Sequence, residues 1–201
     1  MSDDGLRWSE EKGIGFYPVV PGDQYNVDYW NKYRGYAKTD LGVLLSRKRV
    51  DLVDKYADGK TTVDVGIGCG QFIEMRGGRT YGYDVNPVAI QWLLDRGLWW
   101  DPYFKDPDVA CFWDSLEHVE RPDQLVSRIR HAVVVSLPIF EGRAHILRSK
   151  HFRKDEHFWY FTEAGFIRWM NGLDFELAEK NRMEVECGRE DIGTFVFVRN
   201  R

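Results

Sequence analysis

The stretch TTVDVGIGCG, residues 61–70, decides the fold. Its β-branched start, residues 61–65, predicts a short buried strand, and Gly66, Gly68 and Gly70 follow at once. Glycines at this spacing allow a tight turn and let a ligand approach the backbone closely. A helix that starts after the turn presents free N–H groups to the same place. The stretch therefore predicts a strand, a glycine turn and a helix, with a ligand over the turn.

An acidic residue follows at the end of the next apolar run. Asp84 comes directly after Tyr81-Gly82-Tyr83, where an acid can accept hydrogen bonds from both hydroxyls of a ribose. Asp64, before the first glycine, would repel a pyrophosphate and suits a cationic group such as an ammonium. No glycine or alanine stands three places after Gly68, which disfavours a dinucleotide. The pattern favours an adenosine-type ligand with a positive charge.

Strand and helix signals alternate along most of the chain. Further strands are expected at residues 81–85, 109–113, 132–137, 175–185 and 194–198. Helices are expected at residues 39–57, 70–77, 87–96, 123–130 and 162–170. This alternation predicts an α/β domain with a parallel sheet between two layers of helices.

The first residues form a separate extension in this interpretation, with residues 1–38 preceding a domain of residues 39–201. Aromatic residues recur there at helical spacing, namely Tyr25, Tyr29, Trp30, Tyr33 and Tyr36. Two readings stay open: a helix that packs its rings on the domain, or a lid over a ligand.

Composition excludes several classes of protein and indicates the cellular compartment. The 201 residues carry a net charge of -4, which argues against non-specific coating of nucleic acid. Three widely spaced cysteines form no CxxC pair and fit a reducing compartment. No apolar run is long enough to span a membrane, and the acidic start lacks the apolar core of a signal peptide. We expect a cytoplasmic protein without membrane contact.

Three motifs together resemble class I S-adenosylmethionine-dependent methyltransferases of the small-molecule type. They are the glycine turn, Asp84-Val85-Asn86-Pro87, and the segment FWDSLEHV at residues 112–119. The resemblance implies a Rossmann-like, seven-stranded, mostly parallel sheet with helices on both faces and an antiparallel last strand pair. It implies S-adenosylmethionine as cofactor, bound by Asp64, Gly66, Ile67, Gly68, Gly70, Asp84, Val85, Asp101, Trp113 and Asp114. One departure is that the segment between Asp84 and Trp113 is short, which affects the third strand and Asp101.

Glu117 and His118 follow Asp114 by three and four residues, so the three side chains would share one face of a helix. With His157 they resemble the Glu-x-x-Glu-His…His metal site of small-RNA 2′-O-methyltransferases and ubiquinone-pathway O-methyltransferases. The resemblance implies a divalent metal, Mg²⁺ or Mn²⁺, held by these four residues. Without a metal, His118 is a candidate general base, or Glu117 and His118 brace the loop.

The expected reaction is methyl transfer to an oxygen or nitrogen of a small polar acceptor. Tyr25, Tyr29, Arg143 and Arg148 are the candidate residues facing that acceptor. Residues 143–154 are rich in Arg and Lys, so a nucleic-acid or nucleotide acceptor is the alternative. A non-catalytic Rossmann-like binding module is the third hypothesis.

Overall fold

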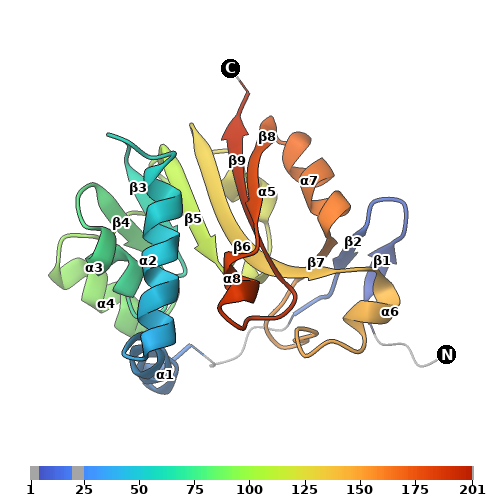
Figure 1. Cartoon of the computed structure of the whole chain (residues 1–201), viewed down its shortest axis with the longest axis horizontal. Coiled ribbons are helices and arrows are strands. Elements are labelled where there is room, and N and C mark those ends of the chain that lie inside the picture. The colour runs from blue at the N-terminus through green and yellow to red at the C-terminus, as the bar shows by residue number, and fades with distance from the viewer. Residues whose placement is uncertain (1–4, 20–24, 201) are drawn as a thin grey trace.

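A twisted sheet of mostly parallel strands runs through the molecule (Figure 1). The structure is a computed structural model and describes residues 5–19 and 25–200. Its parallel centre consists, in order, of β4 (Thr80–Tyr83), β3 (Thr62–Val65), β5 (Val109–Trp113) and β6 (Ala132–Phe140). Strand β9 (Ile192–Arg199) pairs antiparallel with β6, and β8 (Phe175–Asn181) pairs antiparallel with β9. The expected Rossmann-like sheet with its antiparallel last pair is therefore confirmed.

The strand count differs from the seven expected. Within the part of the chain that the structure describes, the sheet has nine strands. The hairpin β1 (Arg7–Ser9) and β2 (Ile14–Phe16) and the short β7 (Trp159–Thr162) extend it beyond the end of β6. The expected third strand is reduced to a single parallel bridge between Gly82 and Trp99. The added strands are too short for an alternating pattern to reveal them.

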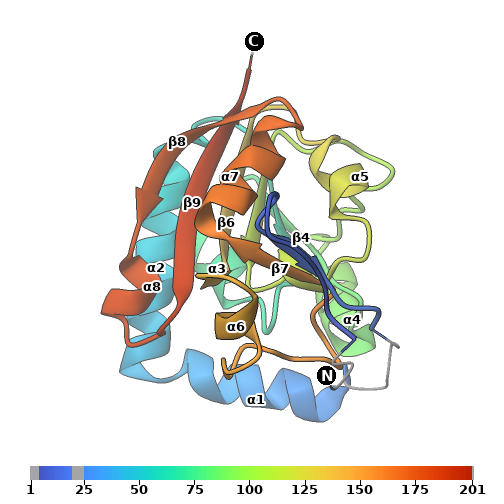
Figure 2. The same cartoon turned by 90° about the vertical axis from the view of Figure 1, so that its right-hand side faces the viewer.

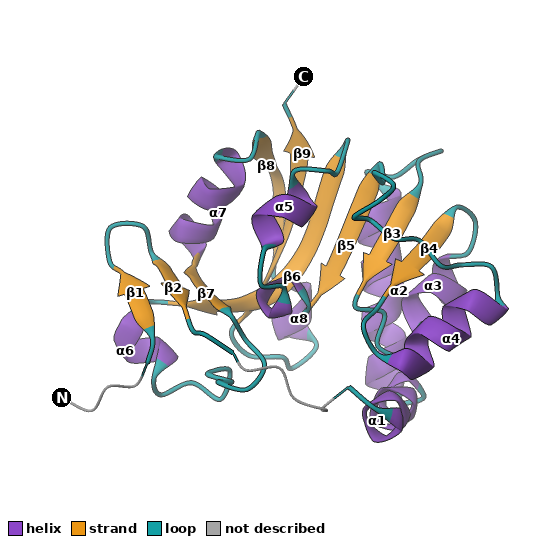
Figure 3. Cartoon of the chain, turned by 180° about the vertical axis from the view of Figure 1, so that it is seen from behind, coloured by secondary structure: helices purple, strands orange, loops and turns teal. Residues whose placement is uncertain are grey.

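Helices cover both faces of the sheet (Figures 1 and 3). One face carries α2 (Asp40–Asp54), α3 (Gln71–Arg76) and α4 (Pro87–Asp95), and the other carries α5 (Pro122–Val126) and α7 (Glu163–Asn171). Shorter elements complete the chain: α6 (Arg143–Ile146), α8 (Met183–Glu186) and the 3₁₀ turn η1 (Leu116–His118).

The central strands serve two apolar cores. In β5, Val109 and Cys111 pack in the core with α2, α3 and α4, while Ala110 and Phe112 pack in the core with α5 and α7. Alternate side chains of a strand point to opposite faces, so a strand buried on both faces needs the continuous apolar run seen here.

Helix starts follow the signals in the sequence. The Asn86 side chain accepts a hydrogen bond from the Val88 N–H at 3.0 Å, and Pro87 begins α4. Thr39 and Thr162 cap α2 and α7 in the same way. No helix within residues 5–19 and 25–200 has the length and apolar character that crossing a membrane requires.

The N-terminal extension divides into two parts. Its first part is the hairpin β1–β2, which pairs with β7. Its second part is α1 (Val27–Ala37), which runs across the end of the sheet toward which β3, β4 and β5 point (Figures 2 and 3). Trp30 anchors this helix, since it is 5% exposed and its ring lies 6.0 Å from that of Trp92.

Candidate functional site

The glycine turn after β3 uses its three glycines for different purposes. Gly66, Gly68 and Gly70 all have positive φ, at 81°, 58° and 81°. A Cβ at Gly66 would meet Ser115 at 2.7 Å, and one at Gly70 would meet the Trp92 ring at 2.5 Å. A Cβ at Gly68 would have its nearest neighbour 3.5 Å away. Packing therefore requires the outer two glycines, whereas a Cβ at Gly68 would only be in ordinary contact with the Tyr33 ring.

Two cavities meet at this turn, with volumes of about 450 and 340 Å³. Both are lined by Tyr33, Gly66, Gly68, Trp113 and Asp114. The first also reaches Arg49, Asp64, Ile67 and Arg189, and the second reaches Tyr25, Tyr29, Tyr83, Asp84, Val85, Tyr103 and His118. The structure thus brings together most of the residues expected to bind the cofactor.

Asp84 presents its carboxyl group at the end of β4. Its Oδ1 accepts a hydrogen bond from the Asn86 N–H at 2.8 Å. Burial raises the pKa of Asp84 to about 6, although hydrogen bonds from backbone N–H groups oppose the shift. The carboxyl group therefore lines the second cavity and changes its charge just below neutral pH.

Asp64 lies beneath the turn and is 1% exposed. Burial moves its pKa well above the usual range, while the positive charge of Arg49 lowers it. Its Oδ1 has no hydrogen-bond partner among the described residues. A cation beside this carboxyl would favour its ionised form, which is consistent with the expectation of a positively charged ligand.

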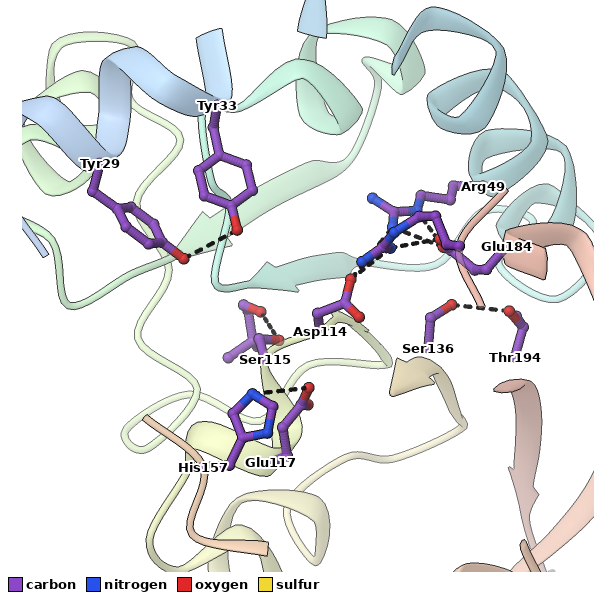
Figure 4. A network of polar contacts seen from close by, with 12 residues as sticks. Tyr29, Tyr33, Arg49, Asp114, Ser115, Glu117, Ser136, His157, Glu184 and Thr194 are labelled. Atoms are coloured by element: carbon purple, nitrogen blue, oxygen red, sulfur yellow. Dashed lines mark hydrogen bonds and ion pairs between the residues drawn. The ribbon is translucent and has the colours of Figure 1, made fainter. Parts of the chain in front are cut away.

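A charge network of Arg49, Asp114, Glu184 and Arg189 closes the first cavity (Figure 4). Arg189 bonds to Asp114 at 2.7 Å and to Glu184 at 2.6 Å, and Arg49 bonds to Glu184 at 2.7 Å. Glu184 is fully buried. The network ties α2, the end of β5 and the turn before β9 together. No motif in the sequence indicated Arg49, Glu184 or Arg189. Arg49 pairs with Glu184 from a distant part of the chain, which leaves no local signal.

Glu117, His118 and His157 form a Glu–His–His cluster, whose potential ligand atoms all lie within 4.8 Å of one another. His157 Nε2 is 4.0 Å from Glu117 Oε1, and these side chains are 3% and 1% exposed (Figure 4). Within the described chain, neither carboxylate oxygen of Glu117 has a hydrogen-bond partner, and His157 Nδ1 has none.

Burial sets the charge of this cluster. It lowers the pKa of His118 to about 4 and that of His157 to about 2, so both imidazoles are neutral at pH 7. Burial and the nearby Asp114 carboxylate raise the pKa of Glu117 well above its usual range.

The fourth expected metal ligand, Asp114, does not join the cluster. Its backbone is left-handed, with a φ of 55°, and only the three-residue turn η1 follows it. The helical face that would align Asp114 with Glu117 and His118 is therefore absent from this segment, and the Asp114 carboxylate pairs with Arg189 instead.

Three tyrosines of the α1 region form a tyrosine ladder, Tyr25, Tyr29 and Tyr33. Their ring centroids are 5.2 and 4.8 Å apart in succession. The Tyr29 hydroxyl donates to the Tyr33 hydroxyl at 3.3 Å, and the Tyr25 hydroxyl lies 3.0 Å from His118 Nδ1. All three tyrosines of the ladder line the second cavity.

Three other candidates lie elsewhere. Asp101 accepts a hydrogen bond from the Tyr103 N–H at 2.8 Å and so caps a turn, and Tyr103 lines the cavity in its place. Among the described residues, the linings of the two cavities do not include Arg143 or Arg148. Both belong to the basic segment 143–154, where Lys150 pairs with Glu190 and Arg153 pairs with Glu156.

Comparison with protein families decides the class of the chain. A family model described as "Methyltransferase domain" matches residues 33–180. The chain belongs to this family. As a member of this family the chain is a methyltransferase, and the hypothesis of a non-catalytic binding module is not supported.

Solved structures share the fold of this methyltransferase. Magnesium protoporphyrin IX methyltransferase from Synechocystis PCC 6803, with bound SAH, is 17% identical with a TM-score of 0.57, covering 89% of this chain and 97% of that chain. A putative methyltransferase of Haloferax volcanii in complex with the Trm112 activator is 14% identical with a TM-score of 0.67, covering 90% and 100%.

A third similar structure is 1,6-didemethyltoxoflavin-N1-methyltransferase from Burkholderia thailandensis, 12% identical with a TM-score of 0.54, covering 98% of this chain and 99% of that chain. No curated protein matches the sequence.

Proposed function

We propose that this methyltransferase transfers the methyl group of S-adenosylmethionine to an oxygen or nitrogen of a small polar acceptor. The observation that carries the proposal is the junction of two cavities at Gly68, which lines both, with Asp84 lining one of them. The cofactor supplies a methyl group activated by its sulfonium charge. The residues described below bind and align it.

Each part of the cofactor has a matching group. The ribose hydroxyls would donate to Asp84, and the adenine would lie against Tyr83 and Tyr103. The methionine part would follow the backbone of the glycine turn into the first cavity, toward Asp64. Gly68 lets the backbone approach the ligand without a Cβ between them.

The acceptor would bind beside the tyrosine ladder, with α1 of the extension 1–38 covering it and residues 39–201 forming the catalytic domain. His118 faces the cavity with a neutral imidazole, which without a metal can accept a proton from the acceptor. A small acceptor is supported by the cavity size and by the acidic partners in the segment 143–154. The magnesium protoporphyrin and toxoflavin enzymes also act on small molecules.

A divalent metal at the Glu–His–His cluster is a second part of the proposal. A buried carboxylate without hydrogen bonds is unfavourable unless a cation or proton joins it, and two neutral imidazoles beside it are ready ligands. The residues therefore fit a metal. Two imidazoles and one carboxylate suit Mn²⁺ better than Mg²⁺, which prefers oxygen ligands. When bound, such a metal would act as a Lewis acid beside the acceptor.

Calorimetric titration with Mn²⁺ tests the metal directly. We expect binding that Glu117→Gln abolishes, and a rise in the melting temperature of the wild-type chain with Mn²⁺. Glu120→Gln, a change of an exposed acid close in sequence, is the matched control and should leave Mn²⁺ binding intact. Equal Mn²⁺ affinity in wild type and Glu117→Gln would contradict the metal site.

Titration with S-adenosylmethionine and S-adenosylhomocysteine tests the main proposal. We expect micromolar binding that weakens at least tenfold in Asp84→Ala. Asp95→Ala removes an exposed acid on α4 and should bind as the wild type does. If neither compound binds the wild-type chain, or if Asp84→Ala binds both compounds unchanged, the proposal is wrong.

A further inference from the structure

We propose that the acceptor is a planar aromatic compound bearing a hydroxyl group, held against the tyrosine ladder with its hydroxyl at His118 Nδ1. This inference rests on the proposed function and names the class of substrate for the same site.

The tyrosine ladder does not serve to anchor α1. Trp30 is the one buried residue of this helix, and it alone enters the apolar core between α1, α2 and α4. Tyr29 and Tyr33 are only partly buried, and both line the second cavity. Helix stability therefore leaves the ladder unexplained, whereas a ligand beside it would complete its burial.

Aromatic surfaces surround this part of the cavity. Tyr29 and Tyr33 contribute rings from α1, and Phe158 and Trp113 contribute rings from the segment before β7 and the end of β5. Aromatic pairs gain stabilisation beyond the burial of their area, and an aliphatic ring cannot supply this gain. The lining therefore favours a flat aromatic ligand.

The polar groups beside the ladder select a hydroxyl. The Ser115 hydroxyl is already engaged, because it donates to the Val65 carbonyl oxygen. His118 Nδ1 lies 3.0 Å from the Tyr25 hydroxyl, so the cavity already accommodates a phenol oxygen at this atom. An acceptor phenol that replaces the Tyr25 hydroxyl would make the same contact.

Methyl transfer to this acceptor needs no further reactant, because its atoms, electrons and charge balance. The phenol oxygen forms a bond to the methyl carbon, and the S–CH₃ bond breaks with its electron pair remaining on sulfur. The hydroxyl proton passes to water. The products are an aryl methyl ether, S-adenosylhomocysteine and a proton.

Calorimetric titration of the S-adenosylhomocysteine-loaded chain with matched alcohols tests the inference. The pairs are phenol with cyclohexanol, catechol with 1,2-cyclohexanediol, and 2-naphthol with decahydro-2-naphthol. We expect the aromatic member to bind at least threefold more tightly in the two-ring pair, which offers the largest aromatic surface to the ladder. If no aromatic member binds more tightly than its saturated counterpart, the inference is wrong.

Variants of the tyrosine ladder distinguish a loss of ring stacking on the acceptor from a loss of folding. Tyr29→Phe keeps the ring and should bind 2-naphthol within twofold of wild type, whereas Tyr29→Leu should weaken it at least threefold. Tyr25→Phe removes the competing hydroxyl and should tighten 2-naphthol binding. Equal weakening in Tyr29→Phe and Tyr29→Leu would contradict stacking.

Each of these variants is first titrated with S-adenosylhomocysteine, which reports folding and the cofactor site. If S-adenosylhomocysteine binds and the aromatic preference is absent, the inference alone fails. If S-adenosylhomocysteine does not bind the wild type, the proposed function itself fails.

Discussion

At the glycine turn, the neighbours of each glycine determine whether a substitution there would affect folding stability or ligand binding. A Cβ added at Gly70 would overlap the Trp92 ring, whereas one added at Gly68 would enter the space where the cofactor backbone contact is proposed. The sequence predicted that all three glycines belong to a ligand-binding turn, because repeated glycines directly after a strand are a local signal. The sequence did not reveal which glycine packs against a side chain and which lies beside a ligand. The side chain that packs against Gly70 is Trp92, which comes from another helix.

Gly68→Ala and Gly70→Ala should therefore differ. A left-handed alanine is unfavourable by about 1 kcal/mol at either position, and the overlap at Gly70 adds roughly 1–3 kcal/mol. We expect thermal unfolding to occur several degrees lower in Gly70→Ala than in Gly68→Ala. S-adenosylhomocysteine affinity should fall more than tenfold in Gly68→Ala. Equal melting temperatures and unchanged affinity would show that the turn is not used in this way.

Asp84 gives the site a pH dependence whose sign follows from its pKa. Burial raises this pKa to about 6, and ribose hydroxyls donate to the ionised form. Binding of S-adenosylhomocysteine should therefore weaken about tenfold between pH 7.5 and pH 5, since most of the carboxyl is protonated one unit below its pKa. The fold itself responds in the opposite sense, because stability from a raised acid pKa is lost as pH rises through about 6.

Asp84→Asn removes both effects. We expect its affinity to be weak and independent of pH between 5 and 7.5, and its melting temperature above pH 7 to exceed that of wild type. Calorimetry and thermal unfolding at the two pH values measure these quantities. A wild-type affinity that is constant from pH 5 to pH 7.5 would contradict the role of Asp84.

At the scale of elements, two contacts connect α1 and the residue before it to α4 and its start. Trp30 packs on Trp92 of α4, and the Asn86 side chain donates to the Asn26 carbonyl oxygen at 3.0 Å. The helix was predictable because its aromatic residues recur at helical spacing. Its position over the carboxyl end of the sheet was not, since a helical pattern states which face is apolar and not what that face covers.

Trp30→Ala should release α1 from the sheet. Truncation of a buried tryptophan typically destabilises by about 3–5 kcal/mol, so we expect faster hydrogen exchange along α1 and weaker S-adenosylhomocysteine binding. Val27→Ala changes an exposed residue of the same helix and serves as the control. Protection of α1 that survives in Trp30→Ala would show that the helix is held by other contacts.

At the scale of the whole molecule, charge distinguishes the two kinds of acceptor. The chain carries a net charge of -4, and within the segment 143–154 Lys150 pairs with Glu190 and Arg153 with Glu156. The sequence showed the basic residues but not the pair of Lys150 with Glu190, because these two residues are distant in the chain. The α/β class and the glycine turn were predictable, because patterns of neighbouring residues in the sequence encode them.

Oligonucleotide binding tests this charge balance. We expect a 20-nucleotide single strand and its duplex to bind no more tightly than about 10⁻⁴ M at physiological salt, the weak end of non-specific binding. Fluorescence anisotropy at several salt concentrations measures it. Micromolar binding with a steep dependence on salt would instead support a nucleic-acid acceptor.

The account depends most on the placement of the cofactor, and a crystal structure of the chain with S-adenosylhomocysteine examines that placement directly. We expect the ribose hydroxyls within hydrogen-bond distance of Asp84 and the homocysteine part along Gly66 and Gly68, with the sulfur facing the tyrosine ladder. A ligand bound away from the glycine turn, or a ribose without contact to Asp84, would contradict the account.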